Sequence, residues 1–463
     1  MNANSDLLDY CGAHEREHLA VLEGAISIPS VSADPLRVGD VRRCGQAFVD
    51  HMRAIGLTAE LLETGGNPIA YGEWLGAPGA PTLLIYGHYD VQPEDPIGLW
   101  KSPPFEATVR DGKIYGRGAV DDKGQALMHL AAIEAHLCTR KKLPINVKVC
   151  VEGEEEIGSP NFEAAVEKYR DKFAADVAVI SDTGMYAKDI PSLTTSLRGL
   201  VHWEITVDGP STDLHSGYFG GVVRNPIEAL AHILVALKNS DGRVEVPGFY
   251  DGVPEIDAHT LDELHALPYD EEREAAAMGV PHLWGESNQP PLARMWFRPT
   301  LECNGIWGGY NGPGSKTIVP SWAKAKLSAR LVGTQDPKRV RKLVRTFIEN
   351  LTPDGVRVSV TDEGTVRPIV ASREHGAVAA AARAMEAAFG KAPVFVGNGG
   401  SIGPAATFDH VLGMPQVLIG VGLPDDSIHA PNEKFDLDQF YGGIRTAAIF
   451  YDELARESSV AAS

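Results

Sequence analysis

The sequence predicts an α/β protein in which a mixed, mostly parallel sheet flanked by helices carries a smaller, inserted ferredoxin-like α+β domain. Two observations predict the larger layer: apolar runs alternate with amphipathic segments before residue 198, and the alternation returns after residue 369. Between them, the order strand–helix–strand–strand–helix–strand is that of a ferredoxin-like domain. We therefore expect residues 1–197 and 370–463 to form one domain and residues 198–369 to form the insertion.

Hydrophobic periodicity predicts the elements of the larger domain. In the segment 38–55, Val41, Cys44, Phe48 and Met52 recur at helical spacing, which predicts an amphipathic helix. The same reasoning gives helices over 7–25, 123–137, 161–169 and 372–389, after 404 and from 438, strands near 59–62, 68–72, 83–87, 145–151, 177–180, 394 and 416–420, and a hairpin over 103–115.

The inserted domain shows a different pattern. Val201, Trp203, Ile205 and Val207 alternate strictly with polar residues, which indicates a sheet with one solvated face. Strands are expected at 201–207, 304–309, 323–332 and 356–360, and helices at 226–238 and 337–351. The segment 241–300 is rich in proline and acidic residues and fits no element pattern, so we expect it to be an elaboration.

The composition disfavours several kinds of partner. Over 463 residues the net charge is -20 and the pI is near 5.2, which argues against nucleic acid and anionic membranes. Five cysteines without paired spacing indicate free thiols in a reducing compartment. Because neither a signal-peptide pattern nor an apolar run of bilayer length occurs, we expect a cytoplasmic location.

A histidine at the end of a predicted strand is the first candidate for metal chemistry. The apolar run 83–86 leads through Gly87 to His88, and Asp90 follows two residues later. In an extended chain such residues share a face, so the Asp90 carboxylate can bond one imidazole nitrogen and leave the other for a metal. A histidine that merely caps the strand is the structural alternative.

Further possible ligands also lie at predicted strand ends, where sites form in open α/β sheets. They are Asp121 with Asp122, the run Glu154–Glu156, Asp182 and His429. Two histidines and several carboxylates without cysteine fit a pair of hydrolytic zinc, cobalt or manganese ions, held roughly 3.5–4 Å apart by a shared carboxylate. A helix cap at 121–122 and a solvated acidic turn at 154–156 are the alternatives.

These stretches resemble the carnosine-dipeptidase/aminoacylase family of dinuclear zinc metallopeptidases, in the same order and over nearly the whole chain. The resemblance implies that one ion is bound by His88, Asp121 and Asp182, and the other by Asp121, Glu156 and His429. It also implies that Glu155 is the general base, that Asp90 orients His88, and that the peptide bond from Asp121 to Asp122 is cis. Two divalent ions are expected, Zn²⁺ first, with Mn²⁺ or Co²⁺ as alternatives.

The resemblance extends to the insertion, for which it implies a lid and a dimerisation surface, and therefore a homodimer. His215 resembles a histidine that reaches the site of the partner subunit and stabilises the developing oxyanion. Arg330 resembles an arginine that binds the substrate carboxylate, and its side chain is expected on the solvated face of its strand. Thr317, Gly400 and Ser401 lie in segments that resemble further substrate contacts. A surface histidine and a surface arginine are the alternatives.

The implied reaction is hydrolysis of the peptide bond of dipeptides or short peptides by a metal-bridging hydroxide, with Glu155 as general base. Aspartate at position 182 and the stretch 86–93 resemble the dipeptidase branch of the family. An N-acyl amino acid deacylase of the desuccinylase or aminoacylase type is the alternative enzyme. A non-catalytic metal-binding scaffold is the alternative of another class.

Overall fold

The computed structural model describes residues 4–461, which divide into two compact units. The larger unit contains the chain up to Thr195, Ala371–Val396 and the chain from Ile402, and the inserted unit contains Ser196–Val370 with Gly397–Ser401. The boundaries lie within two residues of those expected. The assignment of residues 397–401 to the larger domain was wrong, because this segment is bound to the start of the insertion, where the Arg198 amide donates to the Gly400 carbonyl at 2.9 Å.

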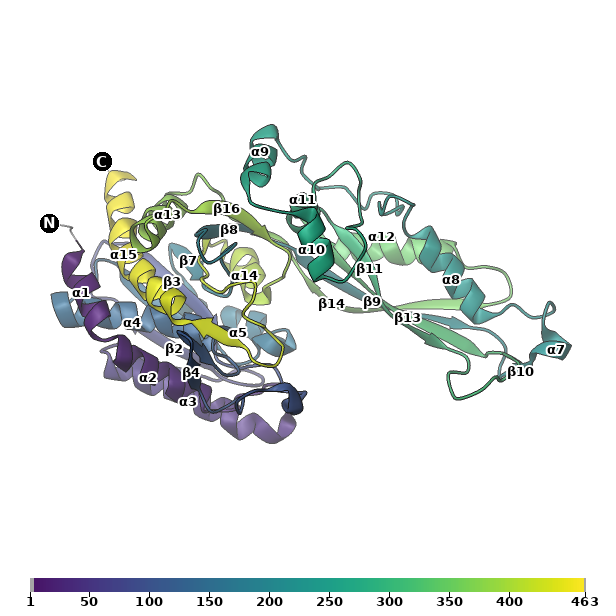
Figure 1. Cartoon of the computed structure of the whole chain (residues 1–463), viewed down its shortest axis with the longest axis horizontal. Helices are drawn as coiled ribbons and strands as arrows, with labels where there is room; N and C mark the ends of the chain where they lie inside the picture. The colour runs from purple at the N-terminus through teal and green to yellow at the C-terminus, as the bar shows by residue number, and fades with distance from the viewer. Residues whose placement is uncertain (1–3, 462–463) are drawn as a thin grey trace. The chain divides into compact units, whose positions relative to one another are not determined.

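A mixed nine-stranded sheet forms the centre of the larger unit (Figure 1). Its four inner strands, β6, β3, β7 and β17, run parallel, and β1, β2, β8 and β15 pair antiparallel with their neighbours, so the expected parallel core is present. The strand order is β1 (Thr58–Leu62), β2 (Ile69–Trp74), β6 (Asn146–Glu152), β3 (Thr82–His88), β7 (Val177–Ile180), β17 (Gln416–Leu418), β8 (Ser192–Leu197) and β15 (Ile369–Val370), with β16 (Val394–Asn398) on β8.

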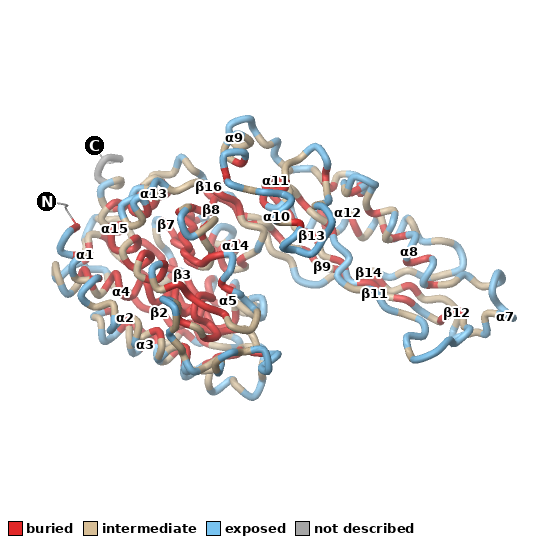
Figure 2. The backbone as a smooth tube through the Cα atoms, viewed as in Figure 1, coloured by how far each residue is buried: buried red, intermediate tan, exposed pale blue. Residues whose placement is uncertain are grey.

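Helices cover this sheet, and Figure 2 shows the buried core between them. They are α1 (Ser5–Ala13), α2 (Glu15–Ile26), α3 (Val38–Ala54), α4 (Lys123–Arg140), α5 (Phe162–Lys168), α6 (Arg170–Phe173), α13 (Gly376–Phe389), α14 (Gly403–Thr407) and α15 (Leu437–Ala461). The single helix predicted over 7–25 is two helices, because the backbone of His14 leaves the helical region at φ -113° and ψ 19°. In the part of the chain that the structure describes, no helix combines the length and apolarity needed to cross a bilayer.

The inserted unit has the predicted ferredoxin-like order. Its antiparallel sheet is ordered β11 (Thr300–Gly308), β13 (Trp322–Leu331), β9 (Gly199–Asp208) and β14 (Arg357–Val366), and α8 (Pro226–Ala236) and α12 (Pro337–Asn350) pack on it. The segment that could not be assigned contains α9 (Ala258–Ala266), α10 (Glu271–Ala277) and α11 (Pro291–Trp296). A two-stranded ribbon of β10 (Leu214–His215) and β12 (Ile318–Val319) is followed by α7 (Ser216–Phe219).

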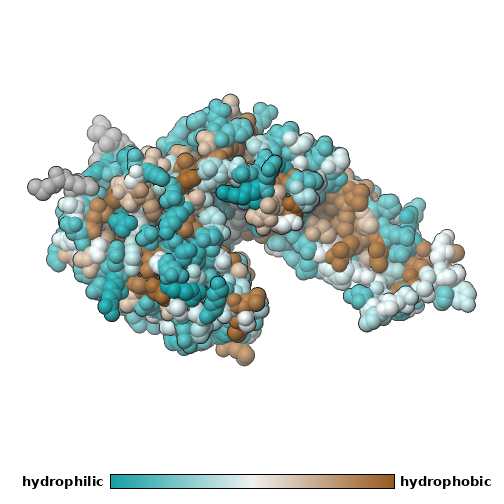
Figure 3. Space-filling model, viewed as in Figure 1, coloured by the Kyte–Doolittle hydropathy of each residue, from teal (hydrophilic) through white to brown (hydrophobic). Residues whose placement is uncertain are grey.

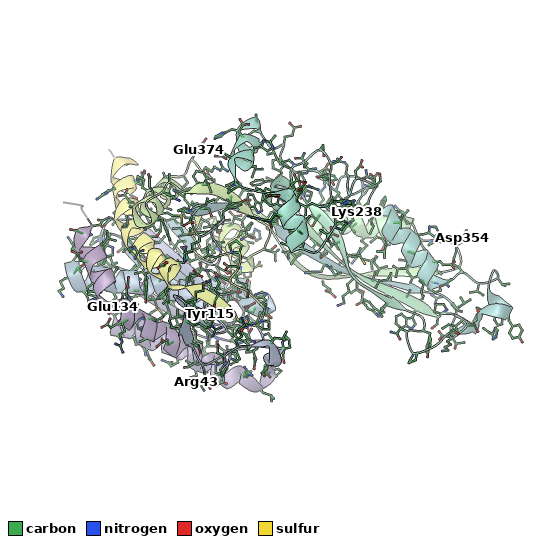
Figure 4. All side chains as sticks on the ribbon, viewed as in Figure 1. Arg43, Tyr115, Glu134, Lys238, Asp354 and Glu374 are labelled. Carbon is green, nitrogen blue, oxygen red and sulfur yellow. The ribbon has the colours of Figure 1, made fainter. Side chains whose placement is uncertain are left out.

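A small three-stranded sheet links distant parts of the larger unit. It is ordered β18 (Lys434–Asp436), β5 (Lys113–Tyr115) and β4 (Thr108–Arg110), and the last two form the predicted hairpin with shorter strands. Tyr115, which is labelled in Figure 4, pairs with Lys434. The loop that follows β5 therefore lies beside the segment that precedes β18, although more than 300 residues separate them in sequence.

Candidate metal centre

The candidate ligands converge where the inner strands of the larger unit end. His88 is the last residue of β3, and Asp182 lies two residues after β7. Glu155 and Glu156 begin a short 3₁₀ turn after β6, Asp121 lies just before α4, and His429 lies in the loop after β17. Because β6, β3, β7 and β17 are parallel, their carboxyl ends meet at one edge of the sheet, which places these loops together.

Asp121 lies between the two histidines. Its Oδ1 is 3.1 Å from Nε2 of His88, and its Oδ2 is 3.0 Å from Nε2 of His429. Nε2 of His429 is also 3.2 Å from Oε2 of Glu156. Ligand atoms of His88, Asp121 and Asp182 lie within 4.8 Å of one another, and so do those of Asp121, Glu156 and His429. These groupings match the two ligand sets that the resemblance implied, with Asp121 shared between them.

The donor set fits two divalent cations. In residues 4–458, no lysine or arginine forms an ion pair with Asp121, Glu156 or Asp182, and the ionisable groups that pair with these carboxylates are the two histidines. Burial raises the pKa of Asp182 well above its usual value, and the charges of Asp121 and Glu155 raise it further. Bonds to Asp121 and Glu156 raise the pKa of His429 to about 10. Buried carboxylates need nearby positive charge, and oxygen and imidazole ligands without thiolate suit hydrolytic divalent ions.

Asp90 makes more contacts than the prediction included. Nδ1 of His88 is 3.0 Å from the backbone carbonyl oxygen of Asp90 and at ion-pair distance, 3.5 Å, from its carboxylate. The carboxylate also accepts from the backbone amides of Glu155 at 3.2 Å and Glu156 at 3.1 Å. Asp90 therefore contacts the imidazole through both its carbonyl and its carboxylate, and the carboxylate in addition fixes the turn that carries the two glutamates. The sequence could not show this because the amides of that turn become available only in the fold.

Glu155 is half-buried beside the ligand sets and accepts no hydrogen bond on its carboxylate from the described residues. Burial raises its pKa to about 7; the charge of His88 lowers it, and those of Glu156 and Asp90 raise it. A carboxyl group with a pKa near neutrality can both accept and return a proton under ordinary conditions. Its environment therefore suits the general-base role that the resemblance implies.

Glu433 was not predicted to have a role, yet it holds the loop that carries Asp121. Its fully buried carboxylate accepts from Nη1 of Arg117 at 2.8 Å and from the amides of Gly118 at 3.0 Å, Val120 at 3.1 Å and Asp121 at 3.2 Å. A single acidic residue after His429 gives no sign in the sequence that it reaches a loop 312 residues away. Only the pairing of β18 with β5 brings them together.

Two further residues fix the ligands. The carboxylate of Asp122 accepts from the backbone amide of His88 at 3.1 Å, and the side chain of Gln92 donates to Oε2 of Glu156 at 2.7 Å. The peptide bond between Asp121 and Asp122 is cis, as the resemblance implied. The acidic pair at 121–122 therefore has divided roles, one side chain among the ligands and the other bound to the strand that carries His88.

The site residues expected in the insertion form two separate groups. His215 is exposed in β10, and the carbonyl of the neighbouring Thr317 accepts from the Ser216 amide at 3.0 Å. Both line a surface pocket of about 790 Å³. Arg330 is half-buried on the solvated face of β13, as predicted, and its Nη1 donates to the hydroxyl of Ser401 at 2.7 Å, with Gly400 adjacent.

Comparison with known families and curated proteins places this arrangement in context. A model of the peptidase family M20/M25/M40 matches residues 84–453. The chain is 35% identical to the Cys-Gly metallodipeptidase dug1 of Schizosaccharomyces pombe over 96% of both proteins. It is 30% identical to the Beta-Ala-His dipeptidase of Homo sapiens over 97% of this chain and 92% of that protein.

Comparison with solved structures also finds peptidases. The dipeptidase Dug1p of Saccharomyces cerevisiae superposes with a TM-score of 0.84 at 26% identity, covering 98% of this chain and 99% of that one. Human carnosine dipeptidase 1 gives 0.82 at 30% identity, covering 97% and 98%. The M20 family metallo-carboxypeptidase Sso-CP2 of Sulfolobus solfataricus gives 0.85 at 33% identity, covering 95% and 99%.

Proposed function

We propose a dipeptidase activity for this chain, which belongs to the peptidase family M20/M25/M40 and is a hydrolase. The observation that carries this proposal is the meeting of two histidines and two further carboxylates around Asp121, with Glu155 beside them. Curated relatives that match almost the full length are a Cys-Gly metallodipeptidase and a Beta-Ala-His dipeptidase. The proposed substrates are therefore dipeptides and short peptides.

The geometry of the larger unit supports the roles proposed for its site residues. His88, Asp121 and Asp182 would hold one divalent ion, and Asp121, Glu156 and His429 a second, with Zn²⁺ as the proposed metal and Mn²⁺ or Co²⁺ as alternatives. When bound, such a pair polarises the scissile carbonyl and acidifies a water molecule. Glu155 would take the proton of the attacking water and return it to the leaving amine, a role that its pKa of about 7 supports.

The inserted unit supports a homodimer, because His215 and Arg330 lie at opposite ends of it. Trp322, which lines the His215 pocket, pairs with Asp208 at one end of β13, and Arg330 pairs with Leu200 at the other. Eight residues of strand span about 26 Å. A dipeptide is only about 7 Å long, so one insertion cannot bring both side chains to the same substrate. We propose that His215 acts on the site of a second copy and stabilises the oxyanion there.

An exposed apolar edge on the inserted unit supports the same proposal. β11 is an edge strand of the four-stranded sheet, and its Ile306 and Trp307 are 54% and 37% exposed. Val235 of the neighbouring α8 is 76% exposed, and Figure 3 shows hydrophobic residues gathered on this part of the unit. An unpaired apolar edge strand favours pairing with another chain, and a second copy is the proposed partner.

Free cysteines, some of them exposed, support the proposed cytoplasmic location.

The activity is tested with purified protein loaded with Zn²⁺, Mn²⁺ or Co²⁺ and a panel of Cys-Gly, β-Ala-His, Ala-Ala and N-acetyl and N-succinyl amino acids. We expect the dipeptides to have the higher kcat/KM. Glu155→Gln should lower kcat on the best dipeptide by about 10²–10⁴-fold while the bound metal is unchanged, because only the proton acceptor is removed.

Glu154→Gln is the matched control, since it removes a neighbouring carboxylate that bonds Asn67 at 2.9 Å and Asn161 at 2.8 Å instead of facing the ligands. It should keep most of the activity. Equal activity of Glu155→Gln and the wild type would exclude Glu155 as the base. If the N-acyl amino acids have the higher kcat/KM, the proposed dipeptidase activity is wrong and the protein is a deacylase.

A further inference from the structure

Two arginines of the inserted unit, Arg198 and Arg330, lie side by side, and the carboxylate whose charge acts on Arg198, that of Glu302, is paired with Lys238 instead. The charge of Arg330 acts on Arg198, and both side chains are half-buried. Neither guanidinium makes an ion pair with any carboxylate of the described chain. Arg198 uses Nε to donate to the Gly399 carbonyl at 2.9 Å, and Arg330 uses Nη1 to donate to Ser401. Their other nitrogens contact no acceptor within the part of the chain that the structure describes, and they are not sealed from solvent.

The position of Arg198 is fixed by the segment Gly399–Ser401. The Arg198 amide donates to the Gly400 carbonyl, and the Ser401 hydroxyl donates to the Arg198 carbonyl. A side chain at position 399 would bring its Cβ within 2.9 Å of Nη2 of Arg198 and 3.2 Å of the Met295 carbonyl oxygen. Glycine at 399 therefore leaves space for the guanidinium. Ser401 bonds both the Arg198 backbone and the Arg330 side chain, so this serine fixes the positions of the two arginines relative to each other.

Two adjacent positive charges in this half-buried setting favour an anion. Burial, together with the charge of Arg330, lowers the pKa of Arg198 to about 10, although the charge of Glu302 opposes this shift. Both groups are still charged at neutral pH. Their repulsion is unfavourable in the free protein, and a bound carboxylate would offset it, because charge-assisted bonds to a planar guanidinium pair are strong and directional.

We propose that Arg198 is the second arginine of the substrate-carboxylate site, where it binds the terminal carboxylate of the substrate together with Arg330. This inference rests on the proposed function, since it assumes a substrate with a free carboxylate. It adds a specificity-determining residue: Arg198 selects substrates that end in a carboxylate over those that end in a neutral amide.

The test compares Ala-Ala with Ala-Ala amide on the metal-loaded wild type, Arg198→Met and Arg198→Lys. Arg198→Met should raise KM for Ala-Ala about tenfold with kcat within twofold, and should leave KM for the amide unchanged, because the lost bond is to the charged carboxylate. Arg198→Lys should recover part of the affinity for Ala-Ala, since lysine keeps the positive charge but lacks the planar guanidinium that can bond both carboxylate oxygens. If Arg198→Met does not fold, Arg198→Lys alone is compared with the wild type and should show a smaller rise confined to Ala-Ala.

Arg224→Met is the matched control. Arg224 is an exposed arginine of the same unit whose Nε also donates to a backbone carbonyl, that of Asp354 at 3.2 Å, and Asp354 is labelled in Figure 4. The KM of Arg224→Met should equal the wild-type value on both substrates. An equal rise of KM on Ala-Ala and its amide in the Arg198 variants, or a loss of kcat alone, would overturn the proposal and leave Arg198 as a support for Gly399.

Failure of the proposed function is a different result. If the wild type hydrolyses no dipeptide, binding of N-acetylalanine and N-acetylalanine amide is measured by calorimetry, which requires no turnover. The wild type should prefer the acid, and Arg198→Met should lose that preference. Equal binding of acid and amide by the wild type would overturn the inference independently of the enzymatic reaction.

Discussion

Glu433→Ala should weaken both the fold and the binding of metal. The substitution removes a fully buried carboxylate that accepts four hydrogen bonds, and it leaves the equally buried Arg117 and three amides of the Asp121 loop without their acceptor. Breaking a buried ion pair by removing one partner costs roughly 3–5 kcal/mol. We expect a loss of about 4 kcal/mol in the free energy of unfolding of the metal-free protein. Metal affinity should fall about 10–100-fold, because the loop that presents Asp121 is less fixed.

Denaturant unfolding in a chelator gives the first value, and competition with a chromophoric chelator gives the second. Glu63→Ala is the matched control, because the Glu63 pair with Arg42 lies on the surface with both side chains more than half exposed. It should cost no more than about 1 kcal/mol and leave metal affinity unchanged. If Glu433→Ala behaves like the control in both measurements, the buried carboxylate does not organise the Asp121 loop and the reasoning is wrong.

Two further predictions concern pH and assembly. Burial lowers the pKa of His129 from 6.5 to about 3, so below pH 6.5 the unfolded chain takes up a proton that the folded chain does not. The free energy of unfolding should therefore decrease as the pH is lowered. In chelator, the decrease between pH 6.5 and pH 5 should be smaller for His129→Gln than for the wild type by about 2 kcal/mol. An unchanged slope would show that His129 is protonated in the fold. Inactive His215→Ala and Glu155→Gln proteins, mixed in equal amounts and allowed to exchange subunits, should recover about a quarter of wild-type activity, because half of the dimers are hybrids with one intact site. No recovery after exchange, shown by mass spectrometry of the hybrids, would mean that His215 does not act across a dimer.

Local hydrophobic patterns predicted most elements of the larger unit. They failed where a segment is buried although most of its residues are polar. Strands such as β3 and β6 are apolar runs, so their sequences predict burial directly. β8 was missed because Ser192–Leu197 is mostly polar, although every one of its residues is buried. Its polar side chains find partners only in the fold; the Thr195 hydroxyl, for example, donates to the Val396 carbonyl, whereas the Ser196 hydroxyl is buried without a partner among the described residues.

The sequence by itself determined the ligand types, their order and the alternation of elements that carries them, because a residue's chemistry and its hydrophobic period are local properties. Tertiary structure alone decided which groups meet: that Glu433 supports Asp121, that Asp90 uses its carbonyl on His88, and that Arg198 lies beside Arg330. Each of these contacts joins segments through the pairing of strands or the bonding of backbone groups. Hydrogen-bond partners of that kind depend on distance in space, which residue spacing along the chain does not encode.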